Sequence, residues 1–399
     1  MDALGRRARA PRMAAVGFLV ATSLYPAPPS LAGQQRFAVD HEAGREVVND
    51  WTRAFLSHVF EVDHARGVVY VAEVGEPELV VGFSLADGTV VGRYGRGPGD
   101  GPGEMRQMVQ DVAAADGGLF VTDGSRVHYW SADGDSVWTW RPASAFAAGL
   151  CAIGDDPVLP LSGGALRGRE GARLGSDGRQ VGSVSDRVSL RSAEAACIGN
   201  TAYFAVEDAL IGHSTDGESV NVPVPREVSD GIADWRASRP DGGRYASSYR
   251  SLSHDGRGRL VLTLPSHMRL GFSAAIIDPA TGCYDLVLDE PSNVHRWVMG
   301  VHADSALVYE RGVSVREING RRTRVVDSEA FMIAVRPLRP AGGEPCAPPA
   351  GKSWLSQPLP RARQAPGAFE AAVAMRYSRA FSLSPCSTAP SSSSPCVRA

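Results

Sequence analysis

The sequence predicts an all-β fold built from six similar four-stranded units, and three observations support this. Short apolar segments alternate with turn residues through the body of the chain, as at residues 59–63, 68–72, 79–83 and 90–94. The same order of segments recurs over residues 109–140. A glycine in the last turn of the unit then recurs six times, at intervals of 46, 44, 39, 65 and 38 residues.

These glycines stand in Asp-Gly-type turns, where a tight reversal needs a positive φ or an Asx hydrogen bond. They are Gly88, Gly134, Gly178, Gly217, Gly282 and Gly320. Repeats near forty residues with four strands and no helix are typical of propeller blades. We therefore predict a six-bladed β-propeller over residues 50–337. The main alternative, one or two β-sandwiches, gives no reason for a turn at near-constant spacing.

A propeller ring needs a partner for its last blade, because an unpaired sheet edge invites association with other chains. Residues 50–55 precede the first unit and follow no turn of their own. We predict that they supply the strand that closes the last blade, at about residues 297–327.

The two ends of the chain differ from its body. Arg6, Arg7, Arg9 and Arg12 precede an apolar run at 13–21, and small residues at Ser30 and Ala32 offer a cleavage point. This order is typical of a secretory signal peptide, predicted at residues 1–32, with a periplasmic or secreted product that has no membrane insertion after cleavage. Residues 338–399 are rich in Pro, Ala and Ser and predict a mostly disordered, low-complexity tail.

The charge distribution argues against nucleic acid as a partner. The net charge of the whole chain is −3. Residues 1–32 have a net charge of +3 and residues 340–399 one of +4, so residues 33–339 have a net charge of −10. Lys352 is the only lysine. An acidic body without basic clusters does not suit phosphate tracking. We expect a monomer whose partner is an unknown small molecule, glycan or protein.

The segment Tyr94-Gly95-Arg96-Gly97-Pro98-Gly99-Asp100-Gly101-Pro102-Gly103-Glu104-Met105 joins one unit to the next. It resembles the "fGxxGxGPGEf" connection of bacterial six-bladed propellers related to NHL-repeat proteins. The sequence pattern of residues 119–134 is also similar to that of NHL repeats. The resemblance covers most of residues 50–337, is strongest over 57–140, and implies a fold rather than a function.

Strand order in a propeller places the links between blades and the loops between second and third strands on one face. The Asp-Gly-type turns then lie on the other face. Loops on a rigid scaffold commonly bind ligands, and the long insertion 223–248 carries flat and cationic groups suited to anionic or ring-bearing ligands. The candidate binding residues on this face are Trp235, Arg236, Arg239, Arg244, Tyr245, Arg96, Asp123 and Arg126. An ordinary solvated loop is the alternative interpretation.

The sequence predicts no catalytic residue, no metal site and no cofactor. The glycine-rich connection lacks the Gly-Lys-Ser/Thr ending and following helix of a phosphate-binding loop. Residues 271–275 lack the second glycine of a serine-hydrolase elbow. His58, His64, His128, His254 and His302 are scattered along the chain without zinc spacing, and are interpreted as surface or packing residues.

Three function classes therefore remain open, the third of them a purely structural interaction module. The first is an exported module that binds a ligand or protein through the loop-bearing face. The alternative is a metal-dependent lactonase- or lyase-like enzyme, as in gluconolactonase-like propellers, which would need Glu61, Asp111 and Asn200 to converge in the central channel. Cys151 and Cys197 occupy like positions in adjacent units, so a disulfide between them is a further possibility in an oxidising compartment.

Overall fold

The computed structural model describes residues 35–49, 55–73, 80–106, 108–141, 146–147, 149–162, 170–175, 179–185, 194–206, 209–239, 249–265, 268–288, 295–318 and 321–346. Within them the chain is mostly β-strand and forms five sheets, with one longer helix, α1 (Arg226–Ala237). The expected signal peptide lies outside the described residues, as does the tail from residue 347 onward.

Four of the sheets each come from one continuous stretch of chain. The first contains β3 (Phe55–Asp63), β4 (Val68–Glu73), β5 (Val80–Ser84) and β6 (Val90–Tyr94). The second contains β7 (Asp111–Ala115), β8 (Gly118–Thr122), β9 (Val127–Ser131) and β10 (Ser136–Trp140). The third contains β11 (Phe146–Ala147), β12 (Cys151–Ile153), β13 (Asp156–Ser162), β14 (Glu170–Leu174) and β15 (Gln180–Ser185). The fourth contains β16 (Ala195–Ile198), β17 (Thr201–Val206), β18 (Ala209–Ser214) and β19 (Ser219–Pro223).

The fifth sheet has nine strands and joins two further groups. One group is β20 (Ser251–His254), β21 (Leu260–Thr263), β22 (Phe272–Ile277) and β23 (Tyr284–Leu288). The other is β24 (His295–His302), β25 (Ser305–Ile318), β26 (Arg321–Gly342) and β2 (Arg45–Asn49). The remaining strand, β1 (Gln35–Val39), pairs with β23 on one side and β26 on the other and so links the two groups.

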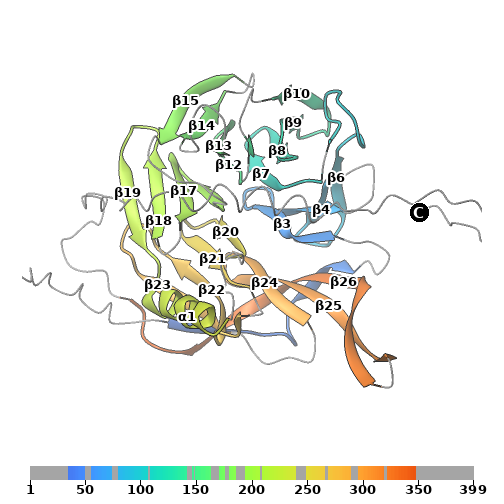
Figure 1. Cartoon of the computed structure of the whole chain (residues 1–399), viewed down its shortest axis with the longest axis vertical. Helices are drawn as coiled ribbons and strands as arrows, with labels where there is room; N and C mark the ends of the chain where they lie inside the picture. Colours follow the sequence, from blue (N-terminus) through green and yellow to red (C-terminus); the bar gives the residue numbers. More distant parts are fainter. Residues whose placement is uncertain are drawn as a thin grey trace, which may run out of the picture. The chain divides into compact units, whose positions relative to one another are not determined.

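The first strands of these groups form a ring. β3, β7, β12, β16, β20 and β24 contact one another in this order, and β24 returns to contact β3. Figure 1 shows the later strands of each group placed progressively further from the centre. Antiparallel sheets that radiate from a ring of inner strands define an all-β propeller.

Packing between neighbouring sheets explains why the strands consist mostly of consecutive apolar residues. All six side chains of β4 and all five of β8 are buried, because both faces of each sheet are covered. One core cluster joins Val68 and Tyr70 to Val112 and Leu119 of the next sheet. Another joins the first sheet to the last through residues such as Val71 and Tyr309.

The recurrent turn glycines have the backbone that the sequence predicts. Gly88, Gly134, Gly217 and Gly282 all have positive φ, between 70° and 93°. A side chain is strained in this region, so glycine is the favoured residue. Gly178 and Gly320 lie outside the described residues.

The strand that closes the ring differs from our prediction. β2 pairs with β26, with Arg45 opposite Val335 and Asn49 opposite Met332. This strand ends before residues 50–55, the segment predicted for the role, and Phe55 instead begins β3. The ordered strands thus start before residue 50 and continue past residue 337. The prediction was wrong because no repeat precedes residue 50 to mark β1 and β2 as strands.

Two disulfides join distant parts of the chain. Cys151 of β12 and Cys197 of β16 are bonded, with Cα atoms 5.4 Å apart, which confirms the possibility raised by their like positions. Cys283 and Cys346 form a second disulfide, with Cα atoms 5.7 Å apart. This second bond ties the start of β23 to the segment that follows β26, beside the closing strands.

Candidate functional site

The alternating strand directions give the ring two faces. The turn face carries the turns between first and second strands and between third and fourth strands. The connection face carries the loops between second and third strands and the links to the next sheet. The first strand of each group therefore starts at the connection face and ends at the turn face.

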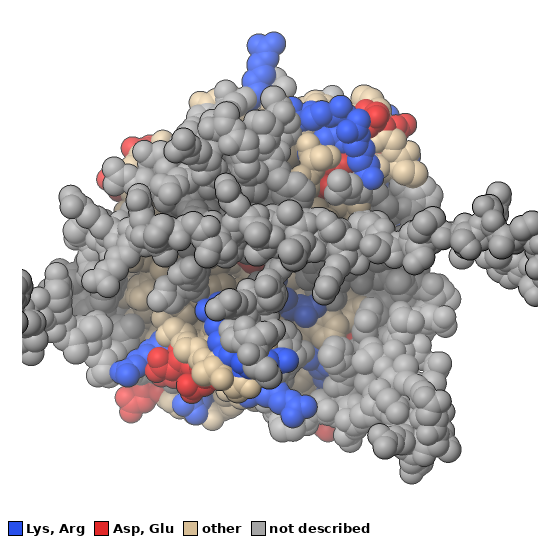
Figure 2. Space-filling view, viewed as in Figure 1, with Lys and Arg blue, Asp and Glu red and all other residues tan. Residues whose placement is uncertain are grey.

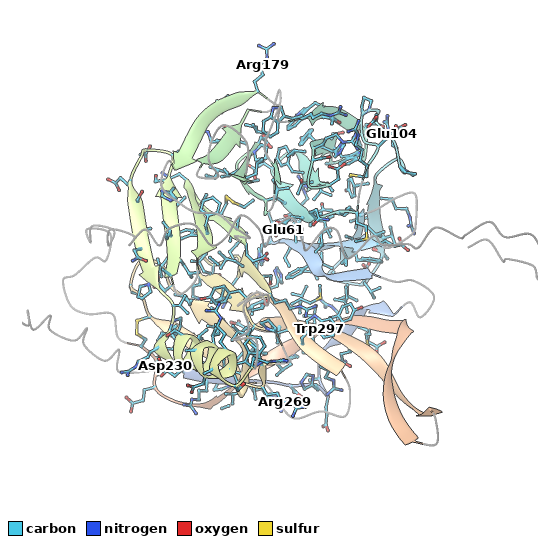
Figure 3. The ribbon with its side chains drawn as sticks, in the orientation of Figure 1. Glu61, Glu104, Arg179, Asp230, Arg269 and Trp297 are labelled. Carbon is cyan, nitrogen blue, oxygen red and sulfur yellow. A yellow bond between two sulfur atoms is a disulfide. The ribbon has the colours of Figure 1, made fainter. Side chains whose placement is uncertain are left out.

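Three carboxyl groups lie on or next to first strands, and the charge of Asp111 acts on both Glu61 and Glu194. Asp111 is the first residue of β7, and Glu194 directly precedes β16, so both lie at the connection face. Glu61 lies further along β3, and Figure 3 shows it near the middle of the ring. All three are only partly accessible to solvent.

The pKa values of these carboxyls are raised, mainly because protein surrounds them and disfavours their charged forms. Desolvation raises the pKa of Asp111 to about 7, and hydrogen bonds from the backbone of Val112 and Leu150 oppose this. Desolvation, with the charge of Asp111, raises the pKa of Glu194 to about 8. Desolvation also raises the pKa of Glu61, followed by the charges of Asp111 and Asp63.

Two of these carboxyls also hold neighbouring first strands together. Glu61 of β3 accepts a hydrogen bond from the backbone of Ala114 in β7. Asp111 of β7 accepts one from Leu150, just before β12. A first strand has no further strand on its inner side, so these carboxyls satisfy backbone N–H groups that no sheet partner reaches.

The arrangement does not fit the divalent ion that an enzyme of the lactonase type would need. Glu61 and Asp111 do approach each other, but Asn200 does not join them. Its amide donates to Asp216 in an exposed turn, 3.0 Å away, on the turn face. Among the described residues, no group of three or more His, Cys, Asp or Glu side chains has the geometry to hold a metal ion.

Part of the predicted binding loop forms α1, which belongs to the link between β19 and β20 and so lies at the connection face. Val228 and Ile232 of this helix are buried in a core cluster, and Trp235 packs against the same cluster. The guanidinium of Arg239 lies 4.9 Å from the ring centre of Trp235. Arg236 is partly exposed, whereas Arg244 and Tyr245 lie outside the described residues.

Asp123 and Arg126 are fully buried and form a structural pair. Arg126 Nη2 lies 2.9 Å from Asp123 Oδ2 and donates a second hydrogen bond to the carbonyl of Gly99, also 2.9 Å away. Asp123 also accepts hydrogen bonds from the backbone of Arg106 and Ser125. These contacts hold the glycine-rich connection on its neighbouring sheet. Arg96, in the same connection, is exposed, and its backbone N–H donates to Gly103.

The backbone of the glycine-rich connection adopts positive φ at Gly95, Gly97 and Gly103, of 127°, 83° and 78°. A Cβ atom at Gly99 would lie 2.0 Å from the carboxylate of Glu104. That carboxylate accepts a hydrogen bond from the backbone of Gly101, 2.7 Å away. Glycine is favoured at the three positions of positive φ because other side chains are strained there, and the side chain of Glu104 folds back over Gly99 and Gly101.

A cluster of three histidines was missed in the sequence. His64, His254 and His302 meet on the turn face, although 238 residues separate the first from the last. No sequence pattern indicated this cluster, because only ring closure brings the turn after β3 beside the ends of β20 and β24. His128 is a packing residue, as expected, and its Nδ1 lies 3.0 Å from Thr139 Oγ1.

Charged side chains of both signs lie near one another on the face that Figure 2 presents. Figure 2 shows arginine side chains beside aspartate and glutamate on the face it presents, without a wide patch of one sign among the described residues. Among the described residues, no helix is both long and apolar enough to cross a membrane.

Comparison with known proteins adds no family. No family model matches the sequence, and no curated protein matches it. Among solved structures, a calcium-binding regucalcin from Agrobacterium tumefaciens is 12% identical with a TM-score of 0.39, and the match covers 76% of this chain and 96% of that one. A luciferin-regenerating enzyme is 10% identical with a TM-score of 0.40, covering 79% and 98%. The WD40 domain of Neurospora crassa Pan2 is 8% identical with a TM-score of 0.35, covering 74% and 90%. Similarity at this level does not indicate which ligand this chain binds or which reaction it catalyses. Its function has to be argued from its own residues.

Proposed function

We propose that the protein is an exported, six-bladed, NHL-like propeller that binds a ligand at the centre of its connection face. The closed order of six first strands supports the blade count. Two disulfides support an oxidising compartment, because such bonds persist mainly outside the cytosol. The arginine-rich segment and apolar run within residues 1–32 support export to the periplasm or beyond.

The pair formed by Asp111 and Glu194 carries the proposal. Both groups stand at the connection-face ends of their strands, and each has a pKa close to neutral pH. Perturbed carboxyls in an enclosed place mark functional sites more often than ordinary surface carboxyls do. A ligand that brings a positive or hydrogen-bond-donating group to this point would stabilise the ionised forms that burial disfavours.

The ligand would extend outward over the same face. The partly exposed Trp235 and Arg236 and the exposed Arg239 offer a flat ring and cations toward the rim, and Arg96 lies on another link of this face. We place Arg244 and Tyr245 in the same binding surface on sequence grounds. Asp123 and Arg126 would serve it indirectly, by fixing the connection that carries Arg96.

A ligand panel tests the proposal. Polyamines, amino sugars and neutral glycans are added to the mature protein at pH 7.5, and the thermal unfolding midpoint is measured. We expect a cationic or amine-bearing compound to raise the midpoint of the wild type and of the turn-face control Asp135→Ala. The double variant Asp111→Asn/Glu194→Gln should show no such rise. An equal rise in all three proteins would place the ligand elsewhere.

A channel-ion enzyme is the second candidate, and the coupling of Glu61 with Asp111 is the observation that favours it. The missing asparagine and the absence of a metal-holding group among the described residues weigh against it. Calcium titration after chelator treatment separates the two candidates. A rise in the unfolding midpoint with calcium, lost in Glu61→Gln, would favour the enzyme. An unchanged midpoint would favour the binding module.

A further inference from the structure

We propose that His64, His254 and His302 form a pH-sensitive latch on the turn face, which holds the ring closed where its last strands meet its first. Each histidine comes from a different group of strands. His64 follows β3, His254 ends β20 and His302 ends β24. The latch therefore spans the contact between β24 and β3, where the last group of strands meets the first.

The hydrogen bonds of the cluster fix where the hydrogens lie when the three imidazoles are neutral. His64 Nε2 lies 2.9 Å from the backbone carbonyl of His254. A carbonyl only accepts, so His64 Nε2 carries the hydrogen, and Nδ1 of a neutral His64 is an acceptor. His302 Nδ1, which lies 2.8 Å from His64 Nδ1, then donates to it.

The geometry limits how many protons the cluster can take up. One extra proton leaves the bond between His64 and His302 intact, because one of the two Nδ1 atoms still accepts. Protonation of both His64 and His302 places hydrogens on both Nδ1 atoms, 2.8 Å apart, and the bond is lost. His254 Nδ1 is likewise held as an acceptor by the backbone N–H of Gly256, 3.2 Å away.

The packing leaves the imidazoles little freedom to move apart. The rings of His64 and His302 are stacked, with centroids 5.0 Å apart and planes inclined by 12°. The ring of His64 also lies 4.5 Å from that of His254. A Cβ atom at Gly256 would come within 2.7 Å of the His64 ring, so glycine at this position makes room for it.

The charged groups around the cluster do not offset a full set of protons. Asp255 is buried and Asp63 nearly so, but Arg259 pairs with Asp255 at 2.7 Å and Arg66 pairs with Asp63 at 3.2 Å. Arg257 and Arg45 act on His302 with the same sign as a proton. Arg257 also binds Asp304 across the β20 and β24 turns. The nearby carboxylates are thus already partnered by arginines.

The pKa values agree with the geometry. Burial, followed by the charges of His254 and His302, lowers the pKa of His64 from 6.5 to about 4. Burial is also the main cause that lowers the pKa values of His254 and His302. Because the histidine pKa is lower in the folded state, the unfolded chain binds more protons than the folded chain between pH 6.5 and about 4. The free energy of unfolding therefore decreases as pH falls through this range.

The conservative variant His64→Gln tests the latch. Glutamine can donate to the carbonyl of His254 and accept from His302, but it cannot be protonated. Urea unfolding of the mature protein is measured at pH 7.5 and pH 5.0. We expect the folding equilibrium constant of the wild type to fall about 30-fold more than that of His64→Gln, from the shift of this one pKa.

Local hydrogen exchange separates a latch from a general loss of stability. At pH 5.0, after correction for intrinsic exchange rates, peptides from β3, β24 and β25 should lose protection before those from β16 to β19. This early loss should be absent in His64→Gln. Uniform loss of protection, or the same pH response in His64→Gln and wild type, would overturn the proposal. Stabilisation of the wild type by zinc at pH 7.5, absent in His64→Gln, would also overturn it by making the cluster a metal site.

Discussion

Arg126 and Asp123 form an ion pair in which both side chains are fully buried, with 2.9 Å between Nη2 and Oδ2. Through Arg126 the pair reaches the carbonyl of Gly99, and through Asp123 it reaches the backbone of Arg106. One pair of side chains thus fixes both limbs of the glycine-rich connection. The sequence placed these residues on a binding face, but their contacts are with the chain itself.

We expect Arg126→Met to destabilise the protein by about 3–5 kcal/mol, because it leaves the buried carboxylate of Asp123 without its partner. Urea unfolding at pH 7 measures the change. The control is Arg141→Met, which removes an exposed arginine 3.7 Å from Asp100 and should cost less than about 1 kcal/mol. Equal losses in the two variants would contradict a structural role for the buried pair.

The raised carboxyl pKa values make a second prediction, on stability at alkaline pH. Asp111 has a folded pKa of about 7 against an ordinary value of 3.8, so the folded state holds a proton that the unfolded chain releases. The stabilisation that this supplies is complete below pH 3.8 and is lost as pH rises through 7. We expect Asp111→Asn to lose less stability than the wild type between pH 5 and pH 9. The difference should exceed about 1.4 kcal/mol, the equivalent of one pKa unit.

Glu194→Gln should behave in the same way, with its effect extending to pH 8. Glu104→Gln serves as the control, because its carboxylate lies in the glycine-rich connection rather than among the three coupled carboxyls. Denaturant unfolding across the pH range gives all three curves. A wild-type response in Asp111→Asn and Glu194→Gln would show that the two carboxyls are not desolvated as described.

The sequence predicted the repeating part of the fold better than its closure. Strands and turns such as Gly88 and Gly134 follow from local pattern and backbone sterics, which repeat in each unit. The Cys151–Cys197 bond followed from like positions in adjacent units. β2, in contrast, belongs to no repeat, and its partner β26 lies nearly 300 residues away.

The candidate site was predictable only in part, for the same reason. Glu61 and Asp111 could be placed in the ring because both stand on predicted first strands. Glu194 precedes a strand in a short unit, so no sequence pattern marked it as a ring residue. Asn200 was predicted to lie in the ring, whereas it lies in the turn after β16. The histidine cluster depends on three turns that meet only when the ring closes.

The disulfides supply a third prediction. Replacing both Cys283 and Cys346 by Ser should destabilise the protein by about 2–4 kcal/mol. Without the bond, the 63-residue stretch between the two positions gains conformational entropy in the unfolded chain. The matched variant lacks Cys151 and Cys197, which are 46 residues apart, and should lose a similar amount. Mass mapping of protein from the native host checks both bonds. Four free thiols would contradict the oxidising compartment as well as the bonds.

Binding to the connection face is the central claim, and calorimetric titration tests it most directly. The strongest compound from the ligand panel is titrated into wild type, Asp111→Asn, Trp235→Ala and the turn-face control Asp135→Ala, in two buffers of different ionisation enthalpy at pH 7. We expect proton release on binding to the wild type, because a cationic group lowers the pKa of Asp111. Asp111→Asn should lose this release, and Trp235→Ala should lose about 2 kcal/mol or more of binding free energy. Asp135→Ala should match the wild type. Equal affinity in all four proteins without proton release would contradict the account.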